Sequence, residues 1–509
     1  MGDYTHIGSR IAKNTLMLYV RMFVLMLVGL YTSRVVLAAL GENDFGIYNV
    51  VGGVVAMFSV ISGALNSAVQ RFITFELGKG DLAKLNKVYS TAVLIQFFIA
   101  LIVVAFAEPI GLWFIDNKMT ILPDRIPAAR LVLHFSLLAF VINLMSVPQM
   151  ASITAHEKMS AYAVIGLLDG FLRLGVAFMI RHSPIDRLVY YAALMAGVVL
   201  VVRGAYGVYC RLNFAECRFR PVFDRPLIKE MFSFAGWNFI GVTSGVLRDH
   251  GGNILVNLFS GPAVNAARGV AVQLNGAVQG FVTNFMTAVN PQITKSYASD
   301  EKDYMFSLVR KSSKLSFFLL LLLALPVIFN ADYILGLWLK EVPAHSALFV
   351  QLFLIFALSE SLSNPLITAM LATGNIRNYQ LVVGGVQLLN IPVSYLFLRL
   401  GAAPEITVVV AIALSQVCLF ARLTMLGKAT GFPVGVYIKE VYTPVIFKVT
   451  LAAVALPLAL RFVLPYGFWG FAASVAACVF GVVLAVLAFG MSSDEREWLK
   501  GMIFRRNAV

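Results

Sequence analysis

Fourteen long apolar segments follow one another along this chain, with only short polar loops between them. Each is long enough, as an α-helix, to cross a bilayer core of about 30 Å, which takes roughly 20 residues. Only 13% of the 509 residues are charged and the mean hydropathy is +0.82, so a water-soluble fold could not bury this much apolar surface. The sequence therefore predicts an all-α polytopic membrane protein, because barrel strands would be about 10 residues of alternating polarity.

We expect transmembrane helices, about 14 in all, at 12–40, 45–69, 88–114, 128–154, 159–180, 187–212, 229–258, 263–289, 307–331, 345–372, 377–399, 405–428, 441–463 and 467–491. No soluble domain fits between them. The sequence also has no Gly-rich loop ending in Lys-Ser or Lys-Thr that would bind a nucleotide. These features argue against a receptor, a kinase and a pump that carries its own ATPase.

The formal net charge of +14 comes from 40 Lys and Arg against 26 Asp and Glu. With the N-terminus placed inside, most of these cations fall in loops on the cytoplasmic side. This asymmetry follows the positive-inside rule and predicts that both termini are cytoplasmic. We disfavour nucleic acid as a partner because no compact basic domain is present. The first segment is too long for a signal-peptide core, so we expect it to be retained as a helix.

The four cysteines, Cys210, Cys217, Cys418 and Cys478, have no metal-binding spacing. Cys210 and Cys217 flank a loop predicted to be cytoplasmic, where thiols stay reduced. We therefore expect no metal, no cofactor and no catalytic residues.

The chain contains an internal repeat. When Leu37 is aligned with Asn257, the stretch 37–41 matches 257–261 and, without a gap, the stretch 71–74 matches 291–294. A second alignment matches Pro148 with Pro365 and Tyr162 with Tyr379. The repeat unit is six helices, so both copies enter the membrane from the same side as parallel repeats.

We divide the chain on this basis into a first lobe (1–212, helices 1–6), a cytoplasmic linker loop (213–228), a second lobe (229–428, helices 7–12), and a C-terminal part (429–509) with helices 13 and 14 and a cytoplasmic tail. Two such pseudo-symmetric lobes are typical of a transporter that works by alternating access.

Several stretches carry a family resemblance. They are Asn14-Thr15, the segment 40–48 (LGENDFGIY), the segment 67–72, and the two matching segments 148–162 and 365–379. Together they resemble the polysaccharide transporter family, the O-antigen type of lipid-linked oligosaccharide flippase. That family belongs to the multidrug/oligosaccharidyl-lipid/polysaccharide exporter superfamily.

The resemblance covers the whole chain. It implies a flippase in the bacterial inner membrane that moves an undecaprenyl-diphosphate-linked repeat unit of O-antigen, capsule or exopolysaccharide from the cytoplasmic to the outer leaflet. A glycan polymerase is a further partner that it suggests.

Charged residues inside the membrane are costly and mark functional sites. Arg248 lies about ten residues from either end of its helix, beside Asp249. Arg268 and Arg34 lie nearer the outer ends of their helices. Arg21 matches Gly241, two helical turns from Arg248, so the two arginines occupy equivalent helix faces. We select Arg248, Arg268, Arg21 and Arg34 as candidates for binding the substrate. Snorkelling to the interface is the alternative for all but Arg248. For Arg248 the alternative is a structural pair with Asp249 or Glu360 that holds helices together.

Two further carboxylates lie inside predicted helices. Asp169 and Arg173 stand one turn apart, and we interpret them as a structural ion pair. Glu360 lies in the middle of its helix, and its repeat counterpart is Asn143. Glu360 and Asp249 are our candidates for ion coupling, while the alternative for Glu360 is a fixed counter-ion of Arg248.

The cations selected above are all arginines. Arginine binds pairs of phosphate oxygens in a bidentate way, so the pattern favours a diphosphate substrate. A cation-coupled multidrug exporter of the same superfamily would favour an acidic, aromatic cavity. An integral membrane glycan polymerase or ligase is a second alternative, although the longest outer stretch, 116–130, has no acid–base pair or metal cluster. A scaffold that docks lipid-linked precursors stays open as a third.

Overall fold

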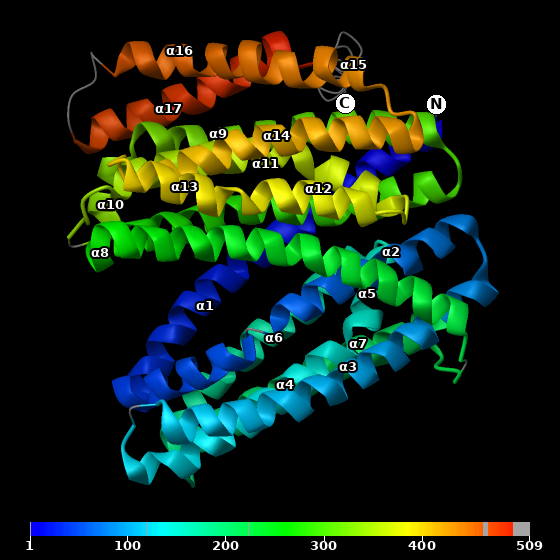
Figure 1. The fold of residues 1–509 in the computed structure, drawn as a ribbon, viewed down its shortest axis with the longest axis vertical. Coiled ribbons are helices and arrows are strands. Elements are labelled where there is room, and N and C mark those ends of the chain that lie inside the picture. Colours follow the sequence, from blue (N-terminus) through cyan, green and yellow to red (C-terminus); the bar gives the residue numbers. More distant parts are fainter. Residues whose placement is uncertain are drawn as a thin grey trace, which may run out of the picture. The chain divides into compact units, whose positions relative to one another are not determined.

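The computed structural model describes residues 2–56, 58–119, 121–221, 223–339, 341–461 and 467–491. All regular secondary structure in these ranges is helical, as Figure 1 shows, which confirms the predicted all-α class. By length and composition, eleven helices within the described ranges are apolar enough to cross a membrane. Of the other three predicted segments, 229–258 and 263–289 are helical but more polar. The segment 45–69 is not the single helix that we predicted, because it is divided between the helices Gly2–Ala56 and Ser59–Lys79. About 14 spanning segments remain consistent with the fold.

The α-helices are α1 (Gly2–Ala56), α2 (Ser59–Lys79), α3 (Leu82–Asn117), α4 (Ile126–Met145), α5 (Val147–Ala155), α6 (Met159–Met179), α7 (Arg187–Asn213), α8 (Arg225–Ala298), α9 (Lys302–Phe329), α10 (Ala331–Trp338), α11 (Ser346–Ala372), α12 (Arg377–Leu388), α13 (Asn390–Arg399), α14 (Ile406–Thr430), α15 (Val434–Tyr437), α16 (Thr450–Leu460) and α17 (Phe468–Ala485). Short 3₁₀ turns are η1 (Pro123–Arg125), η2 (Ile180–His182) and η3 (Ala215–Cys217), and π-helical turns are η4 (Ile438–Tyr442), η5 (Pro444–Val449) and η6 (Val486–Gly490).

Two predicted helices are each interrupted near a proline. The segment 128–154 divides into α4 and α5 at Ser146, and Pro148 follows in the first turn of α5. The segment 377–399 divides into α12 and α13 at Leu389, and Pro392 follows in the first turn of α13. Proline lacks a backbone N–H and clashes with the preceding turn, so each break begins just before the ring.

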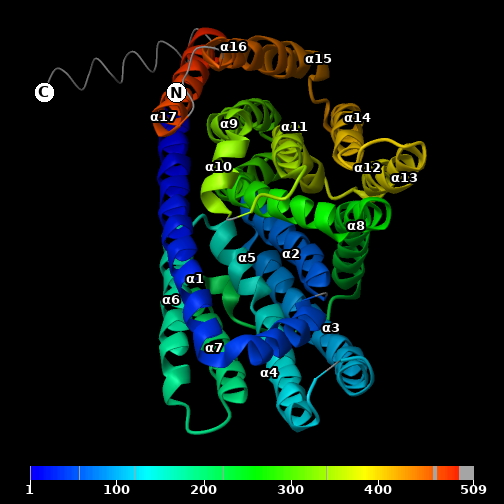
Figure 2. The ribbon, with the colours of Figure 1, turned by 90° about the vertical axis from the view of Figure 1, so that its left-hand side faces the viewer.

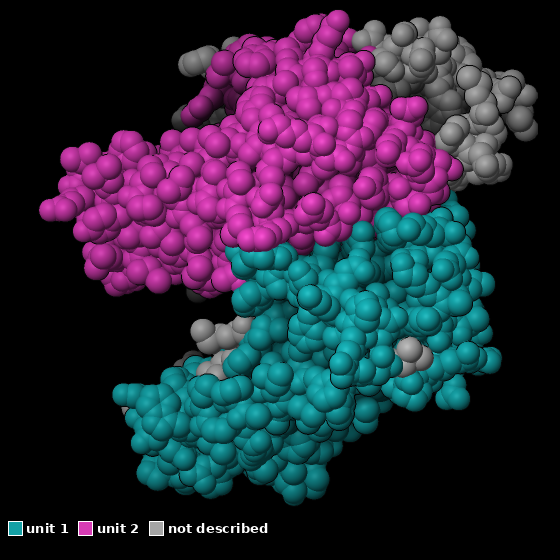
Figure 3. Space-filling model, turned by 45° about the vertical axis from the view of Figure 1, so that its right-hand side comes forward, with its two compact units in different colours: residues 1–242 teal, residues 243–509 magenta. Residues whose placement is uncertain are grey.

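The chain forms two compact units, Met1–Val242 and Thr243–Val509, coloured teal and magenta in Figure 3. In the first unit α1 packs on α6 and α4 packs on α7 (Figure 2). In the second unit α11 packs on α9 and α14, and α16 packs on α17 (Figure 1). The division predicted from the repeat, into 1–212, 213–228, 229–428 and 429–509, differs from these two units and stays a prediction.

The unit boundary falls inside α8, whose first turns belong to the first unit. Asn238 donates a hydrogen bond from Nδ2 to the carbonyl oxygen of Ala64 at 3.2 Å. The rings of Phe234 and Phe72 meet edge to face with centroids 5.7 Å apart. The start of α8 is therefore fixed by α2.

The repeat reappears in the backbone. Gly41 (φ 80°, ψ 169°) and Gly261 (φ 80°, ψ 177°) interrupt α1 and α8 at positions that the first repeat alignment pairs. These angles are accessible essentially only to glycine. The same alignment pairs Gly80 with Asp300, which both have positive φ, and the second alignment pairs Glu157 with Gly374, which do so too. The two lobes thus share their turns, which confirms the predicted pseudo-symmetry.

Candidate functional site

Helix α8 carries both arginines selected in the second lobe, one on each side of the break at Gly261. Arg268 donates from Nη2 to the backbone oxygen of Asp249 at 2.9 Å. In a straight helix, with a rise of about 1.5 Å per residue, these two groups would lie far out of hydrogen-bonding reach, so α8 folds back on itself at Gly261. The glycine therefore makes a helical hairpin that brings Arg268 beside the turn bearing Arg248.

Arg248 lies inside the second unit, with its side chain 13% exposed. Its Nε donates to Asp249 Oδ1 at 2.9 Å, and its guanidinium carbon lies 4.8 Å from the ring centroid of Phe356. Among the described residues no hydrogen bond to its Nη1 or Nη2 is found. Two N–H-bearing nitrogens of this guanidinium are thus available to a ligand.

Arg248 lines a cavity of about 180 Å³. Its other polar lining residues come from the second arm of the α8 hairpin and from α11; they are Gln279, Thr283, Glu360, Ser361 and Asn364. This lining combines donors, acceptors and one carboxylate around one guanidinium, a set that suits a polar or anionic group.

Glu360 lines this cavity, and beside it lies a cation that sequence reasoning missed. Arg422 on α14 is 2% exposed, and its Nη1 lies 3.7 Å from Glu360 Oε1. Glu360 is therefore not an isolated acid. A sequence signal for Arg422 exists, because it lies well inside an apolar span, where burying a charge is expensive.

Arg268 is buried at 7% exposure and holds the α8 hairpin together. Besides its bond to the Asp249 backbone, it donates from Nη1 to Asn253 Oδ1 at 3.1 Å, and it lies 5.3 Å from the ring centroid of Phe353. It is not among the residues that line the 180 Å³ cavity. We call Arg248, Arg268, Arg422, Asp249 and Glu360 the arginine cluster; within it arginines outnumber carboxylates.

The candidates in the first lobe lie in different surroundings. Arg21 is half-buried, with its guanidinium carbon 4.6 Å from the ring centroid of Tyr162, and it fills the space above Gly166 on α6. Arg34 is exposed. The predicted pair forms, since Arg173 donates from Nε to Asp169 Oδ1 at 2.9 Å.

The first lobe also has a counterpart of the Glu360–Arg422 pair. Arg203 on α7 donates from Nε to Asn143 Oδ1 at 2.7 Å, and Asn143 is the repeat partner of Glu360. Asn143 and Arg173 line a cavity of about 250 Å³ with Tyr48 and Phe140. Sequence reasoning missed Arg203 although it lies inside an apolar span.

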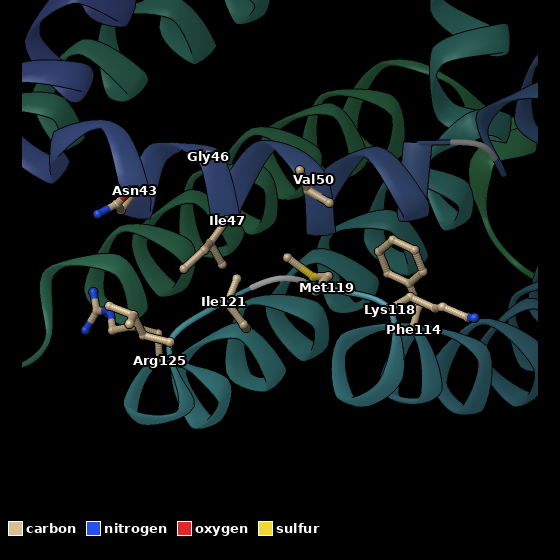
Figure 4. A pocket seen from close by; sticks show the side chains of 10 residues that line it. Asn43, Gly46, Ile47, Val50, Phe114, Lys118, Met119, Ile121 and Arg125 are labelled. Atoms are coloured by element: carbon tan, nitrogen blue, oxygen red, sulfur yellow. The ribbon is translucent and has the colours of Figure 1, made fainter.

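A larger pocket of about 460 Å³ lies in the first unit between residues 43–50 of α1 and the C-terminal end of α3 (Figure 4). Ile47, Met119 and Ile121 lie between Arg125 at one end and Lys118 at the other. Arg125 forms ion pairs with Asp44 and Asp186. Because two carboxylates neutralise this arginine, the pocket is mainly apolar and we assign it no anion-binding role.

Two acids outside the membrane spans have shifted pKa values. Burial alone would raise the pKa of Glu216, but the hydrogen bond between its Oε1 and His156 Nε2, at 2.5 Å, holds that pKa below the ordinary value. Burial would also raise the pKa of Asp186, but the hydrogen bond from Arg125 Nη1 at 2.5 Å, the backbone N–H groups of Val189 and Leu188 and the charge of Arg125 together lower it. Within the described ranges no group of three His, Cys, Asp or Glu residues could hold a metal ion.

Several solved structures share this fold. A MATE protein in its bent conformation superposes with a TM-score of 0.72 at 10% identity, covering 84% of this chain and 96% of that one. An outward-facing multidrug resistance MATE family transporter of the MOP superfamily gives 0.71 at 12% identity, covering 83% and 95%. A MOP superfamily transporter from Pyrococcus furiosus, whose binding pocket has reversed polarity, gives 0.69 at 10%, covering 84% and 96%.

Family profiles agree with the fold. A profile described as polysaccharide biosynthesis protein matches residues 11–297, and the MatE profile matches residues 252–396. No curated protein sequence matches the chain. The eleven apolar helices of the described ranges indicate a multi-pass membrane protein. Because the first profile spans more than half of the chain, the protein belongs to the polysaccharide biosynthesis protein family.

Proposed function

We propose that the protein is a flippase that moves an undecaprenyl-diphosphate-linked oligosaccharide across the bacterial inner membrane, from the cytoplasmic to the outer leaflet. The substrate would be a repeat unit of O-antigen lipopolysaccharide, capsule or exopolysaccharide. Membership of the polysaccharide biosynthesis family supports this substrate class. The observation that carries the proposal is the arginine cluster, where Arg248 lines a polar cavity and arginines outnumber carboxylates.

The diphosphate docks on Arg248. A guanidinium holds two phosphate oxygens in its planar fork, and in a low-dielectric site each charge-assisted bond is stronger than in water. Arg268 keeps the α8 hairpin closed, so that the turn carrying Arg248 is fixed before substrate arrives. Arg21 and Arg34 serve as accessory cations on the path of the anionic group, and alternating access comes from rocking of the lobes 1–212 and 229–428.

Ion coupling centres on Glu360, with Asp249 as the second candidate. Glu360 lines the same cavity as Arg248, and its carboxylate lies 3.7 Å from the guanidinium of Arg422. A phosphate that engages Arg248 changes the field at this carboxylate, which favours release or uptake of a proton or a sodium ion. Both termini are cytoplasmic in this scheme, and a glycan polymerase receives the product on the outer side.

The test is complementation of surface-glycan display in a strain that lacks its own flippase. Arg248→Ala abolishes display because the fork is lost, and Arg248→Lys restores little of it because an ammonium lacks the planar pair of donors. Arg399→Ala, which removes an exposed cation at the end of α13, is the matched control and retains activity. Normal display by an inserted Arg248→Ala protein would refute the docking assignment.

The competing function is a cation-coupled multidrug exporter, which the MatE match favours. Proteoliposomes separate the two: the flippase translocates a short-chain polyprenyl diphosphate sugar and not an organic cation. An integral membrane polymerase or ligase of glycans would instead lengthen the sugar, which the same vesicles report by product mass.

A further inference from the structure

The loop that joins α7 to α8 is held firmly by its backbone. Asn86 on α3 donates from Nδ2 to the carbonyl oxygens of Glu216 at 2.8 Å and Arg218 at 2.9 Å. The backbone N–H of Arg220 donates to Ser90 Oγ at 3.1 Å. Because main-chain atoms make these bonds, the positions of the loop's side chains are fixed without using the side chains themselves.

Those side chains alternate between cations and aromatic rings. Phe219 is 48% exposed and Phe223 is 69% exposed. Arg218, Arg220 and Arg225 are exposed around them, and the Arg225 guanidinium carbon lies 5.9 Å from the Phe223 ring centroid. We call these five residues the linker surface.

The acids near the linker surface only partly offset its charge. Glu216 is 4% exposed and is hydrogen-bonded to His156. Asp224 accepts the backbone N–H of Leu227 at 3.1 Å, as a helix cap. Glu230 is exposed. Further exposed cations on the adjoining helix ends are Lys87, Arg211 and Lys229.

The depth of the linker surface follows from the helices that meet there. The candidate spans Leu82–Asn117 and Arg187–Asn213 each have an end at the loop, and α8 begins at Arg225. The loop therefore lies where the hydrocarbon core gives way to headgroups, on the side predicted to be cytoplasmic. Phenylalanine rings beside arginines fit that layer, since rings enter the acyl boundary while guanidinium groups meet phosphates.

We propose that the linker surface binds anionic phospholipid headgroups, independently of the transported substrate. A cation near an anionic leaflet gains about fivefold in affinity per residue. An acidic protein partner would pair with the arginines, but it would leave Phe219 and Phe223 against a charged surface. Anionic lipid accommodates both the arginines and the rings. The lipid fixes the connection between α7 and α8 to the bilayer surface.

Native mass spectrometry of the purified full-length protein tests this proposal, with phosphatidylglycerol and phosphatidylcholine added separately. The wild type binds phosphatidylglycerol in preference. Arg218→Ala with Arg220→Ala lowers phosphatidylglycerol affinity at least about tenfold, while the corresponding double Lys variant keeps most of it. Arg181→Ala with Arg399→Ala, which removes two exposed cations elsewhere, leaves both affinities unchanged.

Equal phosphatidylglycerol binding by wild type and the double Ala variant would overturn the proposal. So would an equal loss of both lipids, because the site would then not recognise charge. Unchanged lipid binding, together with lost co-purification of an acidic membrane enzyme, would assign the surface to a protein instead. Thermal unfolding of each variant confirms that it is folded, which is expected because the anchoring bonds involve the backbone.

Discussion

In each lobe an arginine inside an apolar helix meets a side chain at a position that the repeat pairs, Asn143 in the first lobe and Glu360 in the second. The chemistry of the two contacts differs. In the first lobe Arg203 meets the neutral amide of Asn143 at 2.7 Å. In the second lobe Arg422 lies 3.7 Å from the carboxylate of Glu360. The shared placement is structural, because a buried guanidinium needs an acceptor in either lobe. Of the two paired side chains, Asn143 and Glu360, only Glu360 is a carboxylate and can change its charge.

The helix after the shared glycine shows the same divergence. In the second lobe this arm of α8 carries Asn265, Arg268, Asn275, Gln279 and Thr283, where the first lobe has Phe45, Tyr48, Val55, Ser59 and Gly63. The backbone break at Gly41 and Gly261 is nearly identical. The comparison teaches that the repeat preserves the turn while the arm after it is more polar in the second lobe.

The largest expected effect is on energy coupling. Glu360→Gln keeps the shape of the side chain but removes its charge, so flipping in proteoliposomes should lose its response to a pH or sodium gradient. Asn143→Leu, at the matched position of the first lobe, should keep that response. Initial rates with and without each gradient measure it. An unchanged response in Glu360→Gln would make the acid a fixed counter-ion and remove the functional difference between the lobes.

A large effect on stability is expected at the two arginines. Arg422→Ala leaves the Glu360 carboxylate without its nearby cation and should lower the free energy of unfolding by about 3–5 kcal/mol. Arg203→Ala leaves only a neutral amide unpaired and should lower it by about 1–3 kcal/mol. Thermal unfolding in detergent compares them. Equal losses would mean that the charge of Glu360 does not distinguish the lobes.

An intermediate and symmetric effect is expected at the glycines. Gly41→Ala and Gly261→Ala force a Cβ into a backbone region open only to glycine, so each should lose about 1–3 kcal/mol of stability. Gly46 and Gly269 have open space around them and ordinary φ angles, so Ala at either position is the control and should cause no loss. Thermal unfolding of the four variants measures the difference. A loss at one break but not the other would contradict the shared backbone.

The smallest expected effect concerns pH. The pKa of Glu216 in the first unit is below its ordinary value of 4.5, with His156 as the lowering partner. Since the folded state binds this proton less readily than the unfolded state, the pair stabilises the fold above pH 4.5, and the contribution is lost as pH falls through the lower, folded-state pKa. Glu216→Gln should flatten this part of the stability profile. Glu405→Gln is the control, because it removes a similar contact in the second unit, between Glu405 Oε1 and His345 Nδ1 at 2.6 Å. Its stability profile should keep the part that depends on Glu216.

The sequence by itself determined the membrane class, the repeat and the local pair of Asp169 with Arg173. Each of these depends on composition, on a fixed offset or on residues one helical turn apart, which are visible along the chain. It also marked Arg248 and Glu360 as buried charges. It did not identify the cation beside Glu360, because Arg422 belongs to a different helix, far along the chain.

Only the tertiary structure decided which charges meet. Arg268 reaches the backbone of Asp249 because α8 reverses at Gly261, and Arg203 reaches Asn143 because α7 packs on α4. Hydropathy places a residue at a depth in the membrane but not against a particular neighbour, since the rotation and packing of helices depend on side chains far apart in sequence. The polar cavity around Arg248 is a product of that packing.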